Sequence, residues 1–358
     1  MHNHAIYLAS LEGLAGKTTI AISFALLAKG EGMKVGYFKP LGFRSDTRSK
    51  ESFDEDAVTL KKITGQEDKP EDICPLTFKR EALLDDFMGI GISRCGTLIV
   101  ESYNKVSAGK DLVLIEGAPK LSYGHILGCP APKLAKDLHA KIIVVTVFRD
   151  DSIIDDLLQA EDYCAKCGAS ISGVVLNKVP EGKMERAKKM IAPFLQEKGI
   201  EILGTVPEDT LLSALTVSEI YEEIGGKLLA GKEGMNRIIK AVLVGAMTPE
   251  SAIRYFQKTK DEIVITGGDR TDIILAALEA GVSGLVLTGN LYPSIKVLPK
   301  ADDLSVPVIL VPDDTYTTLQ KIRNIVGKIK PEDHARIDRA KSLVMDNVDW
   351  RRILEMWN

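Results

Sequence analysis

Residues 5–28 read AIYLASLEGLAGKTTIAISFALLA, and this stretch decides the fold. The apolar run from Ala5 to Ala9 predicts a buried strand, and the apolar residues that follow Thr19 recur at helical spacing. A strand, a Gly-rich turn, a Lys-Thr pair and a helix, in that order, form the layout of a phosphate-binding P-loop. The sequence therefore predicts a protein that handles a nucleotide.

The residue types of this turn suit phosphate chemistry. Glycines let backbone N–H groups approach phosphate oxygens, Lys17 supplies a positive charge, and the Thr18 hydroxyl can ligate Mg²⁺. The common spacing G-x-x-x-x-G-K-[ST] requires glycine where this chain has Leu11, so the loop is a variant. The alternative is a helix start with a Gly-rich turn that binds nothing. The residues expected to contact nucleotide here are Gly13, Gly16, Lys17, Thr18 and Thr19.

Length and composition limit the classes of function. A chain of 358 residues favours about two domains, and 45% hydrophobic with 27% charged residues is ordinary for a globular protein. The net charge of −4 provides no basic field, so we expect no nucleic acid and no membrane as partners. No leader-like segment and no run of about 20 apolar residues is present. We expect a cytoplasmic protein.

The five cysteines predict reduced thiols and no disulfide framework. Cys164 and Cys167 form a C-x-x-C near the end of an expected helix, without a second cysteine or histidine pair at zinc-site spacing. A structural or incidental role is therefore favoured over a metal or redox role.

Apolar runs alternate with helical patterns along residues 1–209. This alternation predicts an α/β fold, a P-loop parallel sheet flanked by helices, because strands covered on both faces read as continuous apolar segments. The expected strands are AIYLAS, KVGYFKP, DLVLIEG, KIIVVTVF, ISGVVLN and IEILGTVP.

A second unit is expected after Pro207. The segment 211–231 reads as helix leading into a smaller α/β domain over residues 210–330. Its expected strands are KAVLVGA, DEIVITGG, VSGLVLTG and VPVILVPDD. Residues 331–358 have helical spacing and few strand signals, which predicts a C-terminal helical tail.

Residues at the ends of the expected strands are candidates for the site, because ligands of open parallel sheets bind beyond the carboxyl ends of the strands. Lys39 lies at the end of one such strand, and the following Pro40 ends that strand because proline has no N–H to donate. A second cation beside Lys17 would neutralise charge on a phosphate or carboxylate. The alternative is a solvated lysine at the end of a strand.

Two carboxylates are candidates for holding Mg²⁺. Glu116, followed by Gly117, ends the run DLVLIE, and a charge at the tip of a buried strand is costly unless it is paired. Asp56, in the acidic run 54–56, precedes a helical pattern and offers a second carboxylate. For Asp56 an acid favoured by the helix dipole is an equal alternative.

Two further segments suggest ligand contacts. Asn177 ends a strand, and its amide offers a donor and an acceptor suited to an adenine edge. In the turn GGDRTD, two glycines precede a helix on which Asp269 and Asp272 are spaced for a capping box. Free N–H groups beside an arginine also suit an anion, so structure and binding stay open. The residues of this second anion site are Gly267, Gly268, Asp269 and Arg270.

Taken together, these residues resemble dethiobiotin synthetase. The matching motifs are Gly16-Lys17-Thr18, Lys39-Pro40, Asp56-Ala57, Glu116-Gly117 and Asn177. The resemblance implies ATP and Mg²⁺ as cofactors, with Lys17 and Lys39 as catalytic residues in a ligase. It implies Thr18, Asp56 and Glu116 as metal ligands.

The whole chain resembles more closely the N-terminal part of long bacterial phosphotransacetylases, in which a dethiobiotin-synthetase-like domain precedes a DRTGG domain. The motifs that carry this resemblance include VLIEG, VVLNK, LGTVPED, the stretch TGGDRTDIILAALEAG and EDHARIDRAKSLV. Asn358 lies where the acetyltransferase domain would begin, so we expect a counterpart without that domain. The relatives imply a homo-oligomer, a dimer.

Two departures bear on function. Asp272 follows the DRT triplet, and its two glycines come before it. Ala118-Pro119 replaces a Gly-rich turn that follows the glutamate in the dethiobiotin enzyme, so the substrate cannot be carried over.

The sequence leaves two main hypotheses of function. The first is a Mg-ATP-binding sensor or regulatory protein with an unidentified small molecule as second ligand. The alternative is an ATP-dependent ligase that activates a carboxylate or carbamate by phosphoryl transfer. Phosphate acetyltransferase activity is disfavoured, because no segment resembles the transferase domain.

Overall fold

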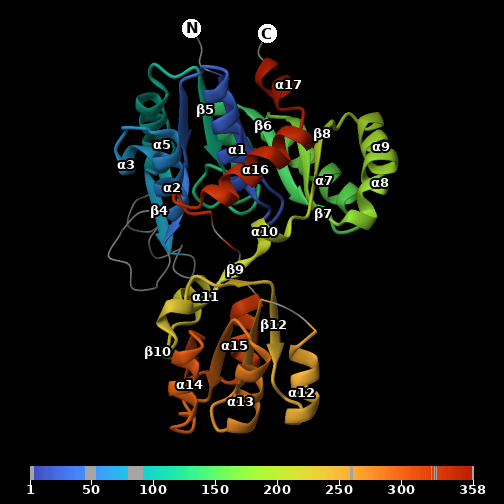
Figure 1. Cartoon of the computed structure of the whole chain (residues 1–358). Coiled ribbons are helices and arrows are strands. Elements are labelled where there is room, and N and C mark those ends of the chain that lie inside the picture. The colour runs from blue at the N-terminus through green and yellow to red at the C-terminus, as the bar shows by residue number, and fades with distance from the viewer. Residues whose placement is uncertain are drawn as a thin grey trace. The chain divides into compact units, whose positions relative to one another are not determined.

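The structure is a computed structural model that describes residues 4–44, 54–79, 92–258, 261–323, 325, 327 and 329–356 (Figure 1). The chain divides into two compact units. Unit 1 comprises Met1–Asp209 together with Ile329–Asn358, and unit 2 comprises Thr210–Lys328. Unit 2 is therefore inserted into the sequence of unit 1.

Unit 1 is built on a six-stranded sheet in the order β2-β5-β1-β6-β7-β8, in which each neighbouring pair runs parallel. The core residues of its central strands are almost completely buried, as expected for a sheet covered on both faces. Its strands are β1 His4–Ala9, β2 Val35–Phe38, β5 Leu112–Glu116, β6 Lys141–Val147, β7 Ile171–Val179 and β8 Ile202–Pro207. The predicted parallel α/β fold is confirmed.

Helices flank this sheet, and a small parallel pair of strands, β3 Leu41–Arg44 and β4 Leu76–Lys79, lies beside it. The helices before β6 are α1 Lys17–Gly30, α2 Glu55–Thr64, α3 Pro70–Ile73, α5 Ile92–Ser107 and α6 Ala131–Asp137. Those after β6 are α7 Ile153–Lys166, α8 Met184–Arg186 and α9 Ala192–Glu197. The strands β3 and β4 were not predicted from the sequence.

The C-terminal segment belongs to unit 1. Its helices are α16 His334–Asn347 and α17 Trp350–Glu355, and α16 packs along α1 and against β8 (Figure 1). Val348 forms a bridge with Gly204, where an added Cβ would lie 2.6 Å from Val348 Cγ2. The residues expected as a helical tail thus cover the helix that follows the Gly-rich turn.

Unit 2 contains a five-stranded sheet in the order β10-β15-β14-β13-β12, parallel except for β10. Its strands are β10 Lys227–Ala230, β12 Ala241–Val244, β13 Glu262–Gly267, β14 Gly284–Thr288 and β15 Val308–Leu310. Its helices are α10 Thr210–Ser213, α11 Val217–Ile224, α12 Pro249–Phe256, α13 Thr271–Ala280, α14 Val297–Asp303 and α15 Thr315–Arg323. Separate apolar clusters form its core.

The segment 211–231 differs from its prediction as one helical stretch. Strand β9 Leu215–Thr216, which pairs with β11 Ile238–Ile239, and strand β10 interrupt it. The helix α11 ends at Ile224 and is followed by Gly225, whose φ of 70° suits glycine. Strand β10, which begins at Lys227, pairs antiparallel with β15. This tertiary pairing overrides the helical spacing.

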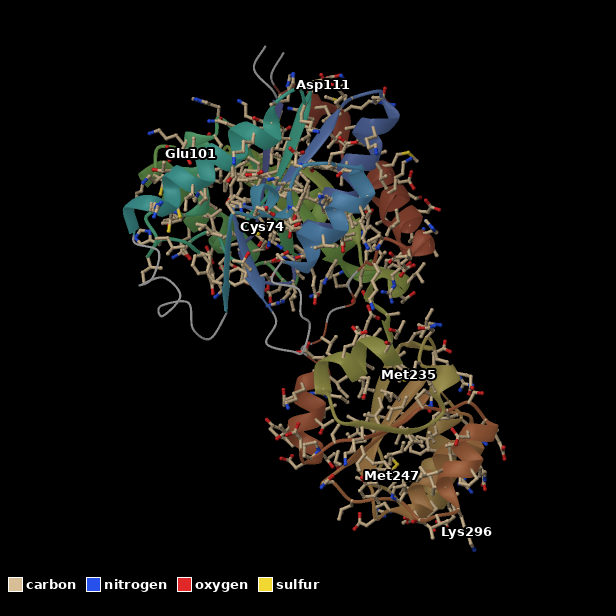
Figure 2. All side chains as sticks on the ribbon, turned by 90° about the vertical axis from the view of Figure 1, so that its left-hand side faces the viewer. Cys74, Glu101, Asp111, Met235, Met247 and Lys296 are labelled. Carbon is tan, nitrogen blue, oxygen red and sulfur yellow. The ribbon has the colours of Figure 1, made fainter. Side chains whose placement is uncertain are left out.

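All five cysteines are free thiols, as expected. Cys164 is buried in α7 and Cys167 follows the last turn of that helix. Figure 2 marks Cys74, which is also buried in unit 1. The described residues contain no group of three or more His, Cys, Asp or Glu placed to hold a metal, and none of their helices is long and apolar enough to cross a membrane.

Candidate nucleotide site

The Gly-rich loop between β1 and α1 requires glycine at one position. Gly16 has a φ of 94°, and an added Cβ would lie 2.3 Å from Asn177 Nδ2. Both the left-handed backbone and the close approach exclude larger side chains. Gly16 is thus fixed by β7 as well as by its own turn.

The first turn of α1 suits an anion. Within the described part of the chain, no side chain caps this helix start, and the residue before the helix is Gly16. The first N–H groups of an α-helix lack partners within the helix and carry partial positive charge. Gly13 and Leu14 are exposed at the tip of the loop. A phosphate group can therefore reach these N–H groups.

Lys17 is buried at this helix start. Its Nζ donates a hydrogen bond to Ser10 Oγ at 2.7 Å, and Ser10 Oγ lies 2.9 Å from the Glu12 and Pro119 carbonyl oxygens. The pKa of Lys17 is lowered to about 8, chiefly by burial; Glu116 opposes this shift and the nearby Lys39 adds to it. An anion at this place would restore a partner to a desolvated charge.

Glu116 is the centre of the site, at the carboxyl end of β5. Thr18 donates to its Oε1 and Tyr37 donates to its Oε2, each at 2.9 Å. Burial raises the pKa of Glu116, and Lys39 and Lys17 oppose this rise. The following Gly117 passes so close to β1 that a Cβ would lie 2.7 Å from Tyr7. Glycine is therefore required directly after the carboxylate.

Lys39 connects three carboxylates. Its Nζ lies 2.8 Å from Asp54 Oδ1, 2.6 Å from Asp56 Oδ2 and 3.5 Å from Glu116 Oε1. Burial would lower the pKa of this lysine, but the carboxylates together raise it well above its usual value. Lys39 is therefore a permanent buried cation and not a solvated lysine.

Asp54 is a site residue that the sequence analysis did not single out. It precedes α2, accepts from the backbone N–H groups of Asp56 and Ala57, and also accepts from Phe43 N at 2.9 Å. An Asp directly before a helical pattern is the available sequence signal for such a cap. Asp54 caps the helix, which leaves Asp56 of the first turn to face Lys39. Tyr37 and Ser10 were missed as well.

The oxygen atoms at this edge fit a magnesium ion. Mg²⁺ is bound through one or two carboxylates together with phosphate oxygens and water. Glu116 contacts the Thr18 hydroxyl, and Glu116 and Asp56 share the Lys39 ammonium. Thr18, Asp56 and Glu116 are therefore the oxygen donors that could hold this ion, which would share both carboxylates with the Lys39 ammonium. The third carboxylate, that of Asp54, also contacts Lys39.

Asn177 lies against the loop. Its Nδ2 donates to the Ala15 carbonyl at 2.8 Å, and the neighbouring Lys178 Nζ donates to the Leu14 carbonyl at 3.0 Å. The structure thus gives Asn177 a contact that orders the loop. The predicted contact of its amide with an adenine edge stays a prediction.

The GGDRTD turn lies in unit 2, and its capping prediction is wrong. The residue before α13 is Arg270, without a side-chain cap bond among the described residues. Arg270 donates to both oxygens of Asp272 at 3.0 Å and to the Met247 carbonyl at 3.1 Å, so Asp272 faces the guanidinium instead of the helix start. Gly268 has no room for a Cβ, which would lie 1.6 Å from Leu291 O. An anion at Gly267, Gly268, Asp269 and Arg270 would have to compete with Asp272.

The family of the chain follows from a match over most of unit 1. Residues 4–216 match the family model described as an AAA domain. The chain belongs to this AAA domain family. Residues 219–325, within unit 2, match the family model described as a DRTGG domain.

Curated relatives agree with both matches. The chain is 25% identical over 354 residues to a phosphate acetyltransferase of Pseudomonas putida, covering 93% of this chain and 49% of the relative. It is 26% identical over 378 residues to that of Pseudomonas aeruginosa, covering 97% of this chain and 51% of the relative. The chain spans about half the length of these relatives. The resemblance to the phosphotransacetylase family is confirmed, and that to dethiobiotin synthetase stays a prediction.

A solved structure with a similar fold is the septum site-determining protein MinD of Pyrococcus horikoshii, complexed with Mg-ADP. It is 18% identical, with a TM-score of 0.37, over 59% of this chain and 83% of that chain. This likeness is too small to support an argument about individual residues of the AAA domain.

Proposed function

We propose that the AAA domain binds Mg-ATP and that the chain acts as a sensor or regulatory protein. The observation that carries this proposal is the convergence of Lys17, Thr18 and Glu116, joined by Lys39, at one edge of the sheet. A helix start, two lysines and a carboxylate with a hydroxyl are the parts that Mg-nucleotide binding needs.

We assign to each part of the site a role that its contacts support. The N–H groups of Lys17, Thr18 and Thr19 at the start of α1 would receive phosphate oxygens, next to the Lys17 ammonium. Thr18, Asp56 and Glu116 would hold the ion, which supplies positive charge against the phosphates. Gly13, Gly16 and Asn177 would shape and line the loop.

The regulatory part of the proposal rests on the C-terminal segment, which returns to unit 1 after unit 2. The chain leaves unit 1 after β8 and returns to it in α16, which packs on α1, the helix that follows the phosphate-binding loop. Asp209 and Arg339 form an ion pair of 2.8 Å between the point of exit and the returning helix. A change in unit 2 would therefore act on elements that contact α1.

Titration calorimetry of the full chain with ATP, ADP and acetyl-coenzyme A, with and without Mg²⁺, tests this function. We expect ATP binding that Mg²⁺ strengthens and that Lys17→Ala weakens at least tenfold. Lys141→Ala is the matched control. Lys141 is exposed at the first residue of β6, at the end of the sheet opposite to the carboxyl ends that form the site. Absence of binding by every nucleotide at millimolar concentration would overturn the proposal.

An ATP-dependent ligase is the second candidate. It is favoured by the position of Lys39, a second buried cation close enough to Lys17 to lower the pKa of that lysine. Two cations can stabilise a phosphoryl group in transfer to a carboxylate or carbamate. Phosphate release from ATP that depends on an added amine or carboxylate would support the ligase. Release that stays at background across such compounds would support the sensor.

We further propose a cytoplasmic homodimer, with a small molecule as second ligand and neither nucleic acid nor membrane as partner. Light scattering after gel filtration measures the oligomeric state directly. A monomer at micromolar concentration, with and without Mg-ATP, would contradict the dimer.

A further inference from the structure

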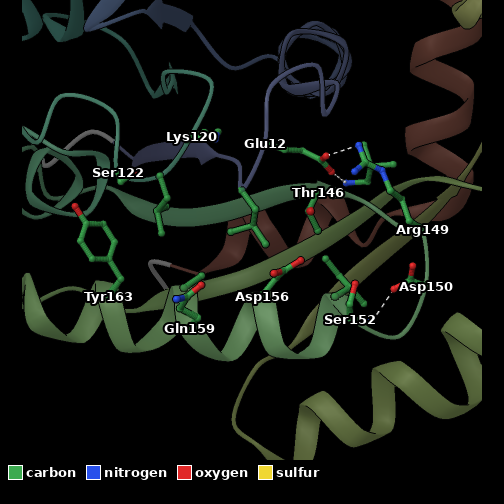
Figure 3. A pocket seen from close by; sticks show the side chains of 15 residues that line it. Glu12, Lys120, Ser122, Thr146, Arg149, Asp150, Ser152, Asp156, Gln159 and Tyr163 are labelled. Carbon is green, nitrogen blue, oxygen red and sulfur yellow. Dashed lines mark hydrogen bonds and ion pairs between the residues drawn. The ribbon is translucent and has the colours of Figure 1, made fainter.

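A cavity of about 560 Å³ lies beside the phosphate-binding loop in unit 1 (Figure 3). It lies beyond the carboxyl end of β6, between the loop after β1, the loop after β5 and one side of α7. This volume is in the range of sites for small metabolites. Residues that line it include Leu11, Lys120, Leu121, Thr146, Asp156 and Gln159.

Thr146 is the unusual residue of this cavity. The residue is 1% exposed, and its hydroxyl has no hydrogen-bond partner among the residues that the structure describes. Figure 3 shows the hydroxyl facing the space above Asp156. A hydroxyl at a cavity wall without a protein partner can bond to water or to a ligand, since polar groups in proteins are nearly always hydrogen-bonded. The Thr146 hydroxyl is therefore available to a ligand atom.

The charged groups of the cavity divide into paired and unpaired ones. Arg149 is paired with Glu12, whose other oxygen accepts from Val147 N at 3.3 Å. Asp150 accepts from Ser152 N at 2.9 Å.

Lys120 and Asp156 form no ion pair within the described parts of the chain. Arg149 and Glu12 form an ion pair, and Asp150 is hydrogen-bonded to Ser152. The exposed ammonium of Lys120, in the loop after β5, and the exposed carboxylate of Asp156, on α7, are left without such a contact among the described residues. A ligand with one charge of each sign matches this arrangement. The buried side chains of Leu121, Ile153 and Ala160 add an apolar surface for the rest of such a ligand.

The helix dipole is an alternative reason for Asp156, since the first turn of α7 carries two acids. Asp155 belongs to the same turn and is exposed, yet it does not line the cavity. Asp155 therefore provides a matched control with the same charge and the same dipole.

We infer that this cavity binds a small zwitterion of the amino-acid class. Asp156 receives the ammonium, Lys120 receives the carboxylate, and the Thr146 hydroxyl completes a hydrogen bond to the ligand. The cavity borders the nucleotide site, because Leu11 and Glu12 of the Gly-rich loop line it. Its occupancy by an amino acid does not require that the chain binds ATP. Because Glu12 belongs to the loop after β1 and pairs with Arg149 of the cavity, an occupant contacts the loop that leads to Lys17.

Isothermal titration of the full chain, without nucleotide, against each of the 20 common L-amino acids at millimolar concentration tests this inference. We expect at least one to bind, and the corresponding amine and the corresponding carboxylic acid to bind at least tenfold more weakly. No binding by any amino acid, or equal binding by the amine or the acid alone, would overturn it.

Variants assign the binding to the cavity. We expect Asp156→Asn and Thr146→Val each to weaken binding of the amino acid at least tenfold. Asp155→Asn should bind it as tightly as the unaltered chain does. Thr146→Val removes a hydroxyl that makes no hydrogen bond within the described protein, so circular dichroism should show an intact fold. Equal effects of Asp155→Asn and Asp156→Asn would contradict the site, and so would unchanged binding in Thr146→Val.

Discussion

Replacing Lys39 by methionine tests the electrostatic centre of the site. The side chain is 6% exposed, and its ammonium lies within 3.5 Å of three carboxylates, those of Asp54, Asp56 and Glu116. Methionine keeps most of the volume but leaves these carboxylates without their common cation. Removing one partner of a buried ion pair costs about 3 to 5 kcal/mol, because the remaining charge stays desolvated. We therefore expect unit 1 to lose that much free energy of unfolding.

Urea unfolding followed by tryptophan fluorescence measures this loss. Both tryptophans of the chain, Trp350 and Trp357, lie in the C-terminal segment of unit 1, and Trp350 is buried. The signal therefore reports unit 1 separately, which matters because a chain of two units need not unfold in one step. A loss of 3 to 5 kcal/mol corresponds to about two to four orders of magnitude in the folding equilibrium.

Lys105→Met is the matched control. Its ammonium lies 2.7 Å from Asp72 Oδ1, but the lysine side chain is 64% exposed. Exposed pairs contribute about 0 to 1 kcal/mol, so the control should lose no more than that. If Lys39→Met loses less than about 1 kcal/mol, or no more than the control, the three-carboxylate centre is not the stabilising element described above.

Three further predictions concern the pH dependence, the centre of the site and unit 2. Because the pKa of Lys17 is lowered to about 8 in the fold, the unfolded chain binds more protons above that pH. Stability of unit 1 should therefore rise between about pH 8 and 10.5, and urea midpoints should lose this rise in Lys17→Met. Tyr37→Phe, which removes the donor to Glu116, should cost about 1.5 to 3 kcal/mol by the same urea assay, and no loss would contradict the bond. Gly268→Ala should abolish the unit 2 transition in calorimetry through its clash with Leu291 and leave that of unit 1, whereas Gly182→Ala, with open space around it, should change neither.

The sequence predicted the two sheets because their parallel strands are continuous apolar runs between helical patterns. It failed where the strand signal was short or depended on a distant partner. Segment 227–230, KLLA, reads equally as helix, and only pairing with β15 makes it a strand. The strands β3 and β4 pair across more than 30 residues of sequence, so no local signal identified them.

The sequence predicted those site residues whose positions follow from the order of the strands. Lys39 directly follows β2, and Glu116 is the last residue of the neighbouring parallel strand β5, so their meeting at one edge follows from the fold. Tyr37 was missed because a tyrosine in an apolar strand is usually a core residue. Its hydroxyl meets Glu116 only through the side-chain direction that the pleated strand imposes, which the sequence does not show. The Thr146 cavity was missed for the same reason, since the local sequence does not reveal the space in front of a strand-end hydroxyl.

The insertion of unit 2 has a consequence for the order of synthesis. A ribosome completes Thr210–Lys328 before it makes α16, so unit 2 emerges while α1 and β8 still lack their cover. At about 5 to 20 residues per second, this interval is on the order of ten seconds. During it, nascent unit 1 exposes the apolar surface of α1 to chaperones and to other nascent chains. The length of this exposure is set by the rate of synthesis through unit 2, and not by how fast unit 2 folds.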